Sequence, residues 1–396
     1  MTGPVRDPMG RALELAALGR GRTAPNPPVG AVVVRAGQIV GEGYHTVAGE
    51  AHAETIALAE AGPLARDATL YVTLEPCCHH GRTPPCTDAI IAAGVAEVCY
   101  ATGDPDPRVA GGGDRALVDA GIRVEAGESE AAAMDLLRGY LLRHRLGRPW
   151  VTAKFAMSLD GKIATRSGDA RWISGEASRA HAHALRDRSD AVIVGIGTVL
   201  ADNPSLTVRP MPSDGRQPHR IVVDTCLRMP LDAALAGPEL AVGTTVAFAA
   251  SGPGPMSDDA SDTDRSGAPA PDLDRSAQAL ADRGLALLAL AADPSGRVDL
   301  RALLDALGGR GYNEVLVEGG GELLAGFFAL GLIDQVQACV APLVIGGRTA
   351  ATPIGGIGVG RIEQAGRFEI VDLVRRDRDV WIVARPDGTP MEVANV

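Results

Sequence analysis

The chain has 396 residues, of which 46% are hydrophobic and only 3% aromatic, and its formal net charge is −11. This length allows two domains with full-sized cores, and the acidic balance disfavours nonspecific nucleic-acid binding, which depends on a basic surface. No stretch reaches the roughly 18 apolar residues of a membrane span, and the N-terminus lacks the apolar core of a signal peptide. We therefore expect a soluble, cytoplasmic protein that binds neither nucleic acid nor membrane.

The first 147 residues alternate between strand and helix signals. Residues 30–45 predict a β-hairpin, and residues 52–61 predict a helix that ends at Gly62. A strand then leads into a cysteine-rich loop, and a helix, a strand, a helix and a short strand follow. Strands that alternate with helices indicate an α/β domain whose helices cover the faces of the sheet. We expect this domain to span residues 1–147, because Arg, Gly and Pro punctuate the chain before a new strand.

Residues 148–396 predict a second α/β domain. The stretch "AHALRDRSDAVIVGIGTVLADNP" predicts a helix, a buried strand and then a loop, and further strands follow with helices between some of them. Residues 251–275 are rich in Pro, Gly, Ser and Asp and hold almost nothing that could be buried. We expect this segment to be a solvated, flexible insertion in the second domain.

The segments "EAHAE" and "EPCCHHGRTPPC" concentrate side chains that bind metals. His52 begins the predicted helix, Cys77 follows a strand, and Cys86 comes nine residues later. One imidazole and two thiolates supply three ligands for tetrahedral Zn²⁺ and leave the fourth position to water, which is the pattern of a catalytic site. The metal lowers the pKa of that water to about 7, which supplies hydroxide at neutral pH. Glu54 lies two residues after the histidine and can shuttle a proton to a leaving amine.

The ligand assignment leaves alternatives open. The zinc deaminase signature is His-x-Glu followed by Pro-Cys-x-x-Cys, whereas eight residues separate Cys77 from Cys86. Cys78, His79 or His80 could replace Cys86 as a ligand. A closed structural zinc site and cysteines buried as small hydrophobic residues are further alternatives, and a disulfide is disfavoured in a cytoplasmic protein.

Two features of the second half suggest catalytic or ligand-binding residues. The chain has 38 Lys and Arg residues together, and only Lys154 and Lys162 are lysines. Both lie in "VTAKFAMSLDGKIA". A lysine ammonium is compact, whereas an arginine guanidinium is a planar fork, so these two lysines suggest positions where arginine could not serve. The alternative is that they were retained by chance. The run "LVEGGGELLAGFF" places three glycines between a strand and a helix, where backbone N–H groups can bind phosphate. A glycine run alone also marks a simple tight turn.

Four motifs of the first half resemble those of one family. "TAPNPPVGAVVV", "GYHTVAGEAHAE", "TLEPCCHHGRTPPCTDAI" and "GDPDPRVAGGG" look like the deaminase half of the bifunctional riboflavin-biosynthesis deaminase–reductases. The resemblance implies a cytidine-deaminase-like, three-layer α/β/α domain. It implies that His52, Cys77 and Cys86 are the zinc ligands and that Glu54 is the catalytic proton shuttle. Asn26 suits the binding of a pyrimidine ring, and a turn role for Asn-Pro is the alternative.

The second half resembles the reductase half of the same family, whose fold is that of dihydrofolate reductase and whose hydride donor is NADPH. The resemblance implies that Lys154 and Asp202 transfer protons during the reduction. It also implies that Trp172 contacts the dinucleotide, and the alternative is that Trp172 packs in the core. It implies a dinucleotide site lined by Ala156, Trp172, Thr198, Asp202, Thr225, Gly320, Gly321, Glu322, Leu323, Leu324, Ala325 and Gly326. It also implies a site for the phosphorylated ribosyl substrate formed by Ala170, Arg186, Leu206, Arg209 and Glu318.

We therefore expect a bifunctional enzyme with Zn²⁺ and NADPH as cofactors. Its first domain would hydrolyse an amine from 2,5-diamino-6-(5-phosphoribosylamino)pyrimidin-4-one, and its second would reduce the ribosyl group to give 5-amino-6-(5-phosphoribitylamino)uracil. Small phosphorylated pyrimidines would be its partners, and a homo-oligomer is compatible with the sequence. The rival hypotheses are a nucleic-acid or nucleoside deaminase with an accessory nucleotide-binding domain, and a zinc-stabilised protein that senses a nucleotide.

Overall fold

The computed structural model describes residues 7–81, 83–250 and 272–388, and within these ranges no helix is long and apolar enough to cross a membrane. Most of the expected insertion at 251–275 lies outside the described residues. Its last residues belong to helix α8 (Leu273–Asp282), which Asp272 caps by accepting a hydrogen bond from the N–H of Arg275. The end of that segment is therefore helical.

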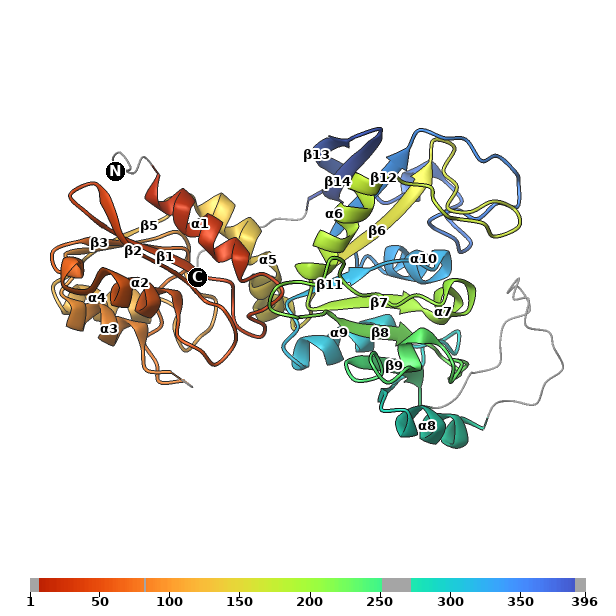
Figure 1. Cartoon of the computed structure of the whole chain (residues 1–396), viewed down its shortest axis with the longest axis horizontal. Coiled ribbons are helices and arrows are strands. Elements are labelled where there is room, and N and C mark those ends of the chain that lie inside the picture. Colours follow the sequence, from red (N-terminus) through yellow and green to blue (C-terminus); the bar gives the residue numbers. More distant parts are fainter. Residues whose placement is uncertain (1–6, 82, 251–271, 389–396) are drawn as a thin grey trace. The chain divides into compact units, whose positions relative to one another are not determined.

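The chain forms two compact units, of which the first contains residues 7–148 and Arg310–Asn313. Its five-stranded sheet has the order β2-β1-β3-β4-β5 (Figure 1). β1 is antiparallel to its neighbours β2 and β3, whereas β3, β4 and β5 are parallel. The strands are β1 (Gly30–Arg35), β2 (Gln38–Tyr44), β3 (Thr69–Val72), β4 (Glu97–Tyr100) and β5 (Arg123–Ala126). The helices are α1 (Pro8–Leu18), α2 (Ala53–Ala61), α3 (Cys86–Ala93), α4 (Gly112–Asp119) and α5 (Glu130–Leu146).

Helices on both faces of this sheet produce three layers. Successive residues of a strand point to opposite faces, so Val33 joins a core with residues of α2, α3 and α4, whereas Val32 joins a second core with residues of α1 and α5. Figure 1 shows α1 on one side of the strands and α2, α3 and α4 on the other. The expected hairpin and the helix that ends at Gly62 are both present. Helices α1 and α5 had no counterpart among the expected elements.

The second unit contains Pro149–Gly309 and Glu314–Thr389, described here up to residue 388, and is built on a nine-stranded sheet. Its order is β10-β9-β8-β7-β11-β6-β12-β14-β13. Every pair from β10 to β12 is parallel, and β14 and β13 complete the sheet as antiparallel strands. The strands are β6 (Trp150–Ser158), β7 (Ala191–Gly195), β8 (His219–Val223), β9 (Thr244–Ala249), β10 (Ala286–Leu290), β11 (Glu314–Val317), β12 (Gln335–Ala341), β13 (Phe368–Arg376) and β14 (Asp379–Pro386).

Helices of the second unit connect the parallel strands. Besides α8 they are α6 (Glu176–Asp187), α7 (Ile196–Asp202), α9 (Leu300–Gly309) and α10 (Gly321–Ala329). Residues of α7 and α8 pack with alternate residues of β7 and β8 in one apolar core. The expected loop after β7 was wrong, because this segment is helix α7, whose buried Ile196 and Val199 give it one apolar side. The hairpin of β13 and β14 was not expected.

Leu70 offers a test of the first core, because it lies in the middle of β3 and is fully buried. Replacing Leu70 with Ala leaves a cavity between the sheet and its helices and should reduce the free energy of unfolding by about 2–5 kcal/mol. Leu64→Ala is the matched control, since 48% of Leu64 is exposed, and it should change the unfolding free energy little. Chemical denaturation measures both, and equal losses would contradict this account of the core.

Candidate active sites

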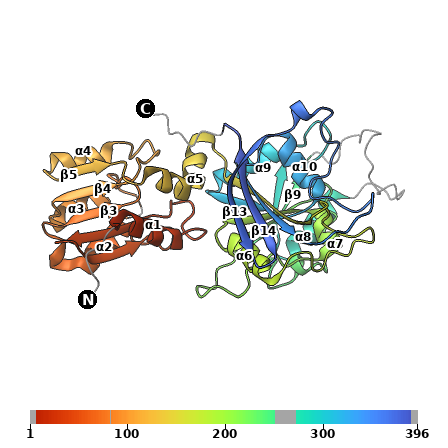
Figure 2. The same cartoon turned by 90° about the horizontal axis from the view of Figure 1, so that it is seen from above.

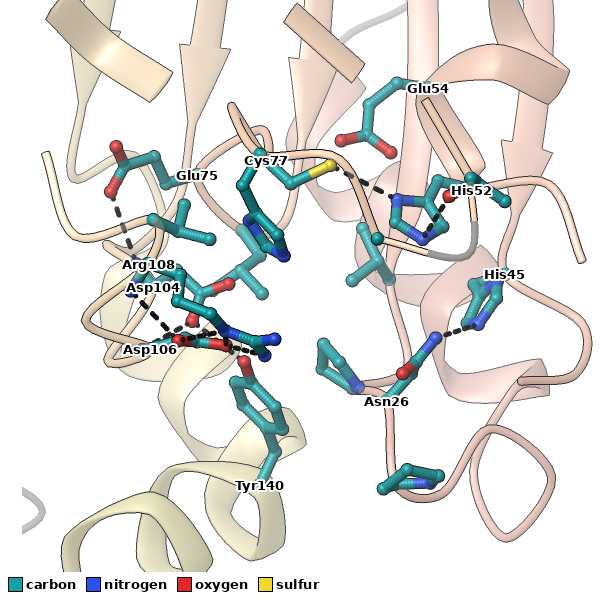
Figure 3. Close-up of a pocket in the computed structure, with 18 of the residues that line it drawn as sticks. Asn26, His45, His52, Glu54, Glu75, Cys77, Asp104, Asp106, Arg108 and Tyr140 are labelled. Atoms are coloured by element: carbon teal, nitrogen blue, oxygen red, sulfur yellow. Dashed lines mark hydrogen bonds and ion pairs between the residues drawn. The ribbon is translucent and has the colours of Figure 1, made fainter. Parts of the chain in front are cut away.

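Three of the predicted metal ligands meet at the helix N-termini of the first unit. The Nδ1 of His52 lies 3.2 Å from the Sγ of Cys86 and 3.5 Å from the Sγ of Cys77. All three ligand atoms lie within 4.8 Å of one another, and Figure 3 shows two of these residues, His52 and Cys77, facing each other. One nitrogen and two sulfurs at such distances match the donor set and the coordination of Zn²⁺. These residues therefore fit a bound zinc ion.

Local structure explains how residues far apart in sequence converge here. His52 is the N-cap residue of α2, and Cys86 is the first residue of α3. Helix α2 lies close against β2, where a Cβ at Gly43 would be 2.5 Å from the carbonyl oxygen of Ala53. A larger residue at Gly43 would push α2, and with it the histidine, away from the sheet. The N–H of Cys86 also donates to the Sγ of Cys77 at 3.3 Å, which ties α3 to the cysteine loop.

The electrostatics of the cluster suit a cation. Hydrogen bonding from Cys86, despite opposing burial, lowers the pKa of the Cys77 thiol to about 4, and His52 adds to this effect. Glu54 follows in the first turn of α2 and is 4% exposed. Burial, with the nearby Cys77 sulfur, raises the pKa of Glu54. A carboxyl group with a raised pKa beside a metal site can exchange protons near neutral pH.

The alternative ligands lie differently. The Sγ of Cys78 points to backbone carbonyls, at 3.6 Å from Arg108 and 4.0 Å from Val109. His79 lines the neighbouring pocket, and His80 is exposed. Of the candidate ligands, only His52, Cys77 and Cys86 form a group of described residues that could hold one metal ion together.

A pocket of about 340 Å³ opens beside the cluster, and Asn26 forms one of its walls. The Nδ2 of Asn26 lies 3.0 Å from the Nε2 of His45, and the Nδ1 of His45 lies 3.1 Å from the carbonyl oxygen of Ala51. In the arrangement that satisfies both contacts, His45 donates from Nδ1 and accepts at Nε2. The Asn26 amide is thereby oriented, and its oxygen remains for a ligand (Figure 3).

The opposite wall carries residues to which the sequence gave us no reason to assign a role. Asp104 accepts hydrogen bonds from the Tyr140 hydroxyl at 2.8 Å and from the N–H of Asp106 at 2.9 Å. Asp106 in turn pairs with Arg108, whose Nε lies 3.0 Å from either carboxylate oxygen. Burial raises the pKa of Asp104 to about 6, whereas the hydrogen bonds from Arg108 lower that of Asp106 to about 2. The only signal in the sequence was the motif "GDPDPRVAGGG".

Glu75 holds this wall in place. Its buried carboxylate accepts hydrogen bonds from backbone N–H groups, at 3.0 Å from Gly111, 3.0 Å from Gly113 and 3.2 Å from Asp114. Glu75 stands two residues before Cys77, so one side chain links the metal cluster to the loop that carries Asp104.

The second candidate site lies where parallel strands end. Parallel neighbours have their carboxyl ends at one edge of the sheet, and the order β8-β7-β11-β6 places the segments after these strands side by side. Thr225 follows β8, Thr198 lies in α7 after β7, and Gly320 caps α10 after β11. A Cβ at Gly320 would lie 3.4 Å from the Oγ1 of Thr198, so these two predicted cofactor residues are in contact range. Ala156 lies near the end of β6.

A buried ion-pair cluster occupies the same edge. Arg186 of α6 donates to Glu318 through both Nε at 2.6 Å and Nη2 at 2.8 Å, and the Nζ of Lys154 lies 3.9 Å from the Oε2 of Glu318. Burial alone would raise the pKa of Glu318, but the charges of Arg186 and Lys154 hold it at about 2. The other lysine, Lys162, donates to the carbonyl of Ala350 at 3.2 Å and has no such partner described.

The remaining predicted residues differ in exposure. Trp172 is 68% exposed, which excludes the core-packing alternative, and the Arg179 guanidinium lies 4.7 Å from its ring centre. Leu206 and Leu324 are buried, so their side chains are not exposed to a ligand. The residues that are exposed or half-buried are Ala170, Asp202, Arg209, Gly321, Glu322, Leu323, Ala325 and Gly326.

Comparisons with known proteins cover both units. Residues 6–102 match the family described as the cytidine and deoxycytidylate deaminase zinc-binding region, and residues 149–381 match the RibD C-terminal domain. The riboflavin biosynthesis protein RibD of Actinobacillus pleuropneumoniae is 40% identical over 375 residues, which cover 94% of this chain and 93% of that protein.

Solved structures of related proteins have the same fold over nearly the whole chain. Acinetobacter baumannii RibD, form 1, is 37% identical with a TM-score of 0.81, covering 96% of this chain and 98% of that one. A Thermotoga maritima structure, titled as a diaminohydroxyphosphoribosylaminopyrimidine deaminase/5-amino-6-(5-phosphoribosylamino)uracil reductase, is 34% identical with a TM-score of 0.79, covering 96% and 97%.

Fold, metal cluster and matches together define a zinc-binding deaminase joined to a reductase that uses a nucleotide cofactor. The chain belongs to the RibD family of bifunctional riboflavin-biosynthesis enzymes. The rival hypothesis of a nucleic-acid or nucleoside deaminase with an accessory domain is not favoured, because the relatives match across both units.

The raised pKa of Asp104, which lines the pocket opposite Asn26, can be tested by measuring stability at different pH values. Because the folded protein binds this proton more tightly than the unfolded chain, whose carboxyl has a pKa of 3.8, the contribution of Asp104 to stability falls as pH rises from about 4 to about 6. Asp104→Asn keeps an acceptor oxygen and removes the titration. Relative to wild type, it should gain about 2–3 kcal/mol of unfolding free energy between pH 4 and pH 7.

Denaturation at several pH values, with the exposed Asp119→Asn as control, measures this difference. A difference between Asp104→Asn and wild type that does not change with pH would show that Asp104 titrates normally.

Proposed function

We propose that the first unit hydrolyses an amine from 2,5-diamino-6-(5-phosphoribosylamino)pyrimidin-4-one, and that the second reduces the ribosyl side chain with NADPH. The product would be 5-amino-6-(5-phosphoribitylamino)uracil. Family membership supports this pair of reactions, and the observation that carries the deaminase half is the convergence of His52, Cys77 and Cys86 beside the buried Glu54.

In the deaminase site, His52, Cys77 and Cys86 are the proposed zinc ligands. Zinc, when bound there, supplies the positive charge that activates water near neutral pH. Glu54 would take a proton from that water and deliver it to the departing amine, a role that suits a carboxyl group whose pKa is raised by burial. The pocket beside the cluster would receive the pyrimidine, with the Asn26 amide hydrogen-bonding the ring.

In the reductase site, the carboxyl edge of the parallel strands would bind NADPH. The N-terminus of α10, at Gly320, has no side-chain cap, and such a helix end attracts phosphate. The proposed cofactor residues are Ala156, Trp172, Thr198, Asp202, Thr225 and the run from Gly320 to Gly326. Leu324 would contribute only its backbone, because its side chain is buried.

The ion-pair cluster would hold the substrate near the nicotinamide. Arg186, Leu206, Arg209, Glu318 and the backbone of Ala170 are the proposed substrate residues. Since Glu318 already engages Arg186 through two hydrogen bonds, Arg209, which is exposed, is the arginine with more freedom to meet a phosphate. Lys154 lies 17% exposed beside Glu318 and, with Asp202, would handle the proton as hydride reaches the first ribose carbon.

Metal content tests the ligand set. The purified protein should contain about one zinc per chain, and His52→Ala or Cys86→Ser should lose most of it, because three protein ligands are needed to retain the ion. Cys78→Ser is the matched control and should keep its zinc, since Cys78 points away from the cluster. Elemental analysis of the folded variants gives the result. Full zinc in both ligand variants would contradict the assignment.

Two variants test whether the reactions are separate. Glu54→Gln keeps the size of the side chain but removes its basicity, so ammonia release should fall by about 10²–10⁴-fold. NADPH oxidation, measured with the already deaminated substrate, should be unchanged. Lys154→Arg should do the reverse, with a loss on the order of 10²-fold in the reductase, because both oxygens of Glu318 are already occupied by a guanidinium.

Ammonia release and NADPH oxidation are followed in separate assays for each variant. Loss of the reductase in folded Glu54→Gln would mean that the two reactions share one site.

A further inference from the structure

Lys154 lies in a row of polar side chains that crosses three neighbouring strands of the nine-stranded sheet. The register of β6 and β12 pairs Lys154 with Gln337. The register of β11 and β6, continued by one residue, places Glu318 on the other side of Lys154. Residues paired in this way have their side chains on the same face of the sheet, at the strand spacing of about 5 Å. Lys154 therefore lies between Glu318 and Gln337.

Helix α6 covers this row. Figure 2 shows α6 on one side of the sheet and α9 and α10 on the other. Arg186 of α6 reaches Glu318 through two hydrogen bonds, and His181 of the same helix lies beside Gln337. The ring of His181 also packs edge-on against buried Trp381, with the ring centres 4.5 Å apart. The row is thus enclosed between the sheet and the helix.

Two groups in this row lack a full set of partners. Gln337 is 7% exposed, and its Oε1 has no hydrogen-bond partner among the residues that the structure describes. The Nζ of Lys154 lies 3.9 Å from the Oε2 of Glu318, which is close enough for an ion pair but too long for a hydrogen bond. A buried polar group without a hydrogen bond costs free energy. An acceptor and a donor that both need a partner are therefore neighbours.

The chemistry of these groups fixes which ends can meet. A lysine ammonium has three donors and no acceptor, so only the oxygen of the Gln337 amide can face it. The amide nitrogen then suits the ring of His181. Burial, together with the charge of Arg376, lowers the pKa of His181 to about 4, although the Gln337 side chain opposes this shift. The His181 ring is therefore neutral at pH 7 and offers an acceptor nitrogen.

We propose that Gln337 is a positioning residue of the reductase site, whose side-chain oxygen accepts a hydrogen bond from the Lys154 ammonium. With Glu318 on one side and Gln337 on the other, two N–H groups of Lys154 are directed along the row, and the third is left for the substrate. A donor whose direction is fixed beforehand needs no reorganisation during the reaction. This inference rests on the proposed role of Lys154 in the reduction and adds the residue that orients it.

Reductase kinetics of the full chain test the inference. Gln337→Met keeps the length of the side chain but removes the acceptor. With the already deaminated substrate, kcat should fall about 10-fold, as expected for one hydrogen bond to a charged group, and KM for NADPH should not change. Gln335→Met is the matched control, because Gln335 is 3% exposed in the same strand but is paired with Thr152. It should keep the wild-type kcat, and thermal unfolding shows whether each variant is folded.

A double variant tests whether Gln337 acts through Lys154. Effects of residues that work through one contact are not additive, so Gln337→Met should slow a Lys154→Met enzyme no further. An additional 10-fold loss in the double variant would overturn the inference. A folded Gln337→Met enzyme with reduced thermal stability and the wild-type kcat would also overturn it, because the role of Gln337 would then be structural only.

Lysine NMR tests the contact without any activity. The chain has only two lysines, so protein labelled with ¹⁵N at lysine gives at most two side-chain ammonium signals, and Lys162→Arg identifies that of Lys154. The Lys154 ammonium protons should exchange with water on the order of 10-fold faster in Gln337→Met than in wild type. Equal exchange rates would overturn the inference. A wild-type protein that shows this difference but oxidises no NADPH would contradict the proposed reduction and still support the contact between Lys154 and Gln337.

Discussion

Parallel strands impose the constraint on which both sites depend. When neighbouring strands run in the same direction, the segments that follow them meet at one edge of the sheet. In the first unit, the chain leaving β3 carries Cys77 and the chain leaving β4 carries Asp104, so the metal cluster and the far wall of the pocket face each other. In the second unit, the same rule gathers Thr198, Thr225 and Gly320. Ligand-binding groups collect at these edges because the helices that follow the strands begin there, and the first N–H groups of a helix have no partner within the helix.

Each candidate site contains one buried glutamate that holds its surroundings in place. The two sites compensate the charge of that glutamate in different ways. Glu75 is neutralised by backbone N–H groups, which at the same time fix the loop from Gly111 to Asp114. Glu318 is neutralised by Arg186 and Lys154, which bring two cations to the place where substrate would bind. A buried carboxylate without such partners would be costly, so each glutamate forces its surroundings into one arrangement. Rigid surroundings of this kind are what catalytic groups require.

The nine-stranded sheet changes character at its end. Strands β10 to β12 are parallel, whereas β13 and β14 form an antiparallel hairpin in which Ile370, Val371 and Leu373 are exposed. A hairpin added to a parallel sheet needs no crossover helix.

The sequence by itself determined the α/β class, the metal-binding segments and the family, because these depend on local patterns. A continuous run of β-branched residues identifies β1, Gly62 ends α2, and short motifs carry His52, Cys77 and Cys86. Each of these signals is carried by a short segment of the sequence, so it can be found without the tertiary structure.

Only the tertiary structure decided which charged residues act together. Arg186 and Glu318 stand 132 positions apart, and Tyr140 and Asp104 stand 36 apart, and no local pattern announces either pair. Helix α7 was read as a loop because its seven residues contain too few turns for a clear period, and packing on β7 stabilises it instead. Residue spacing within a segment follows from backbone geometry, whereas partners across a sheet follow from strand order, which the linear sequence does not display.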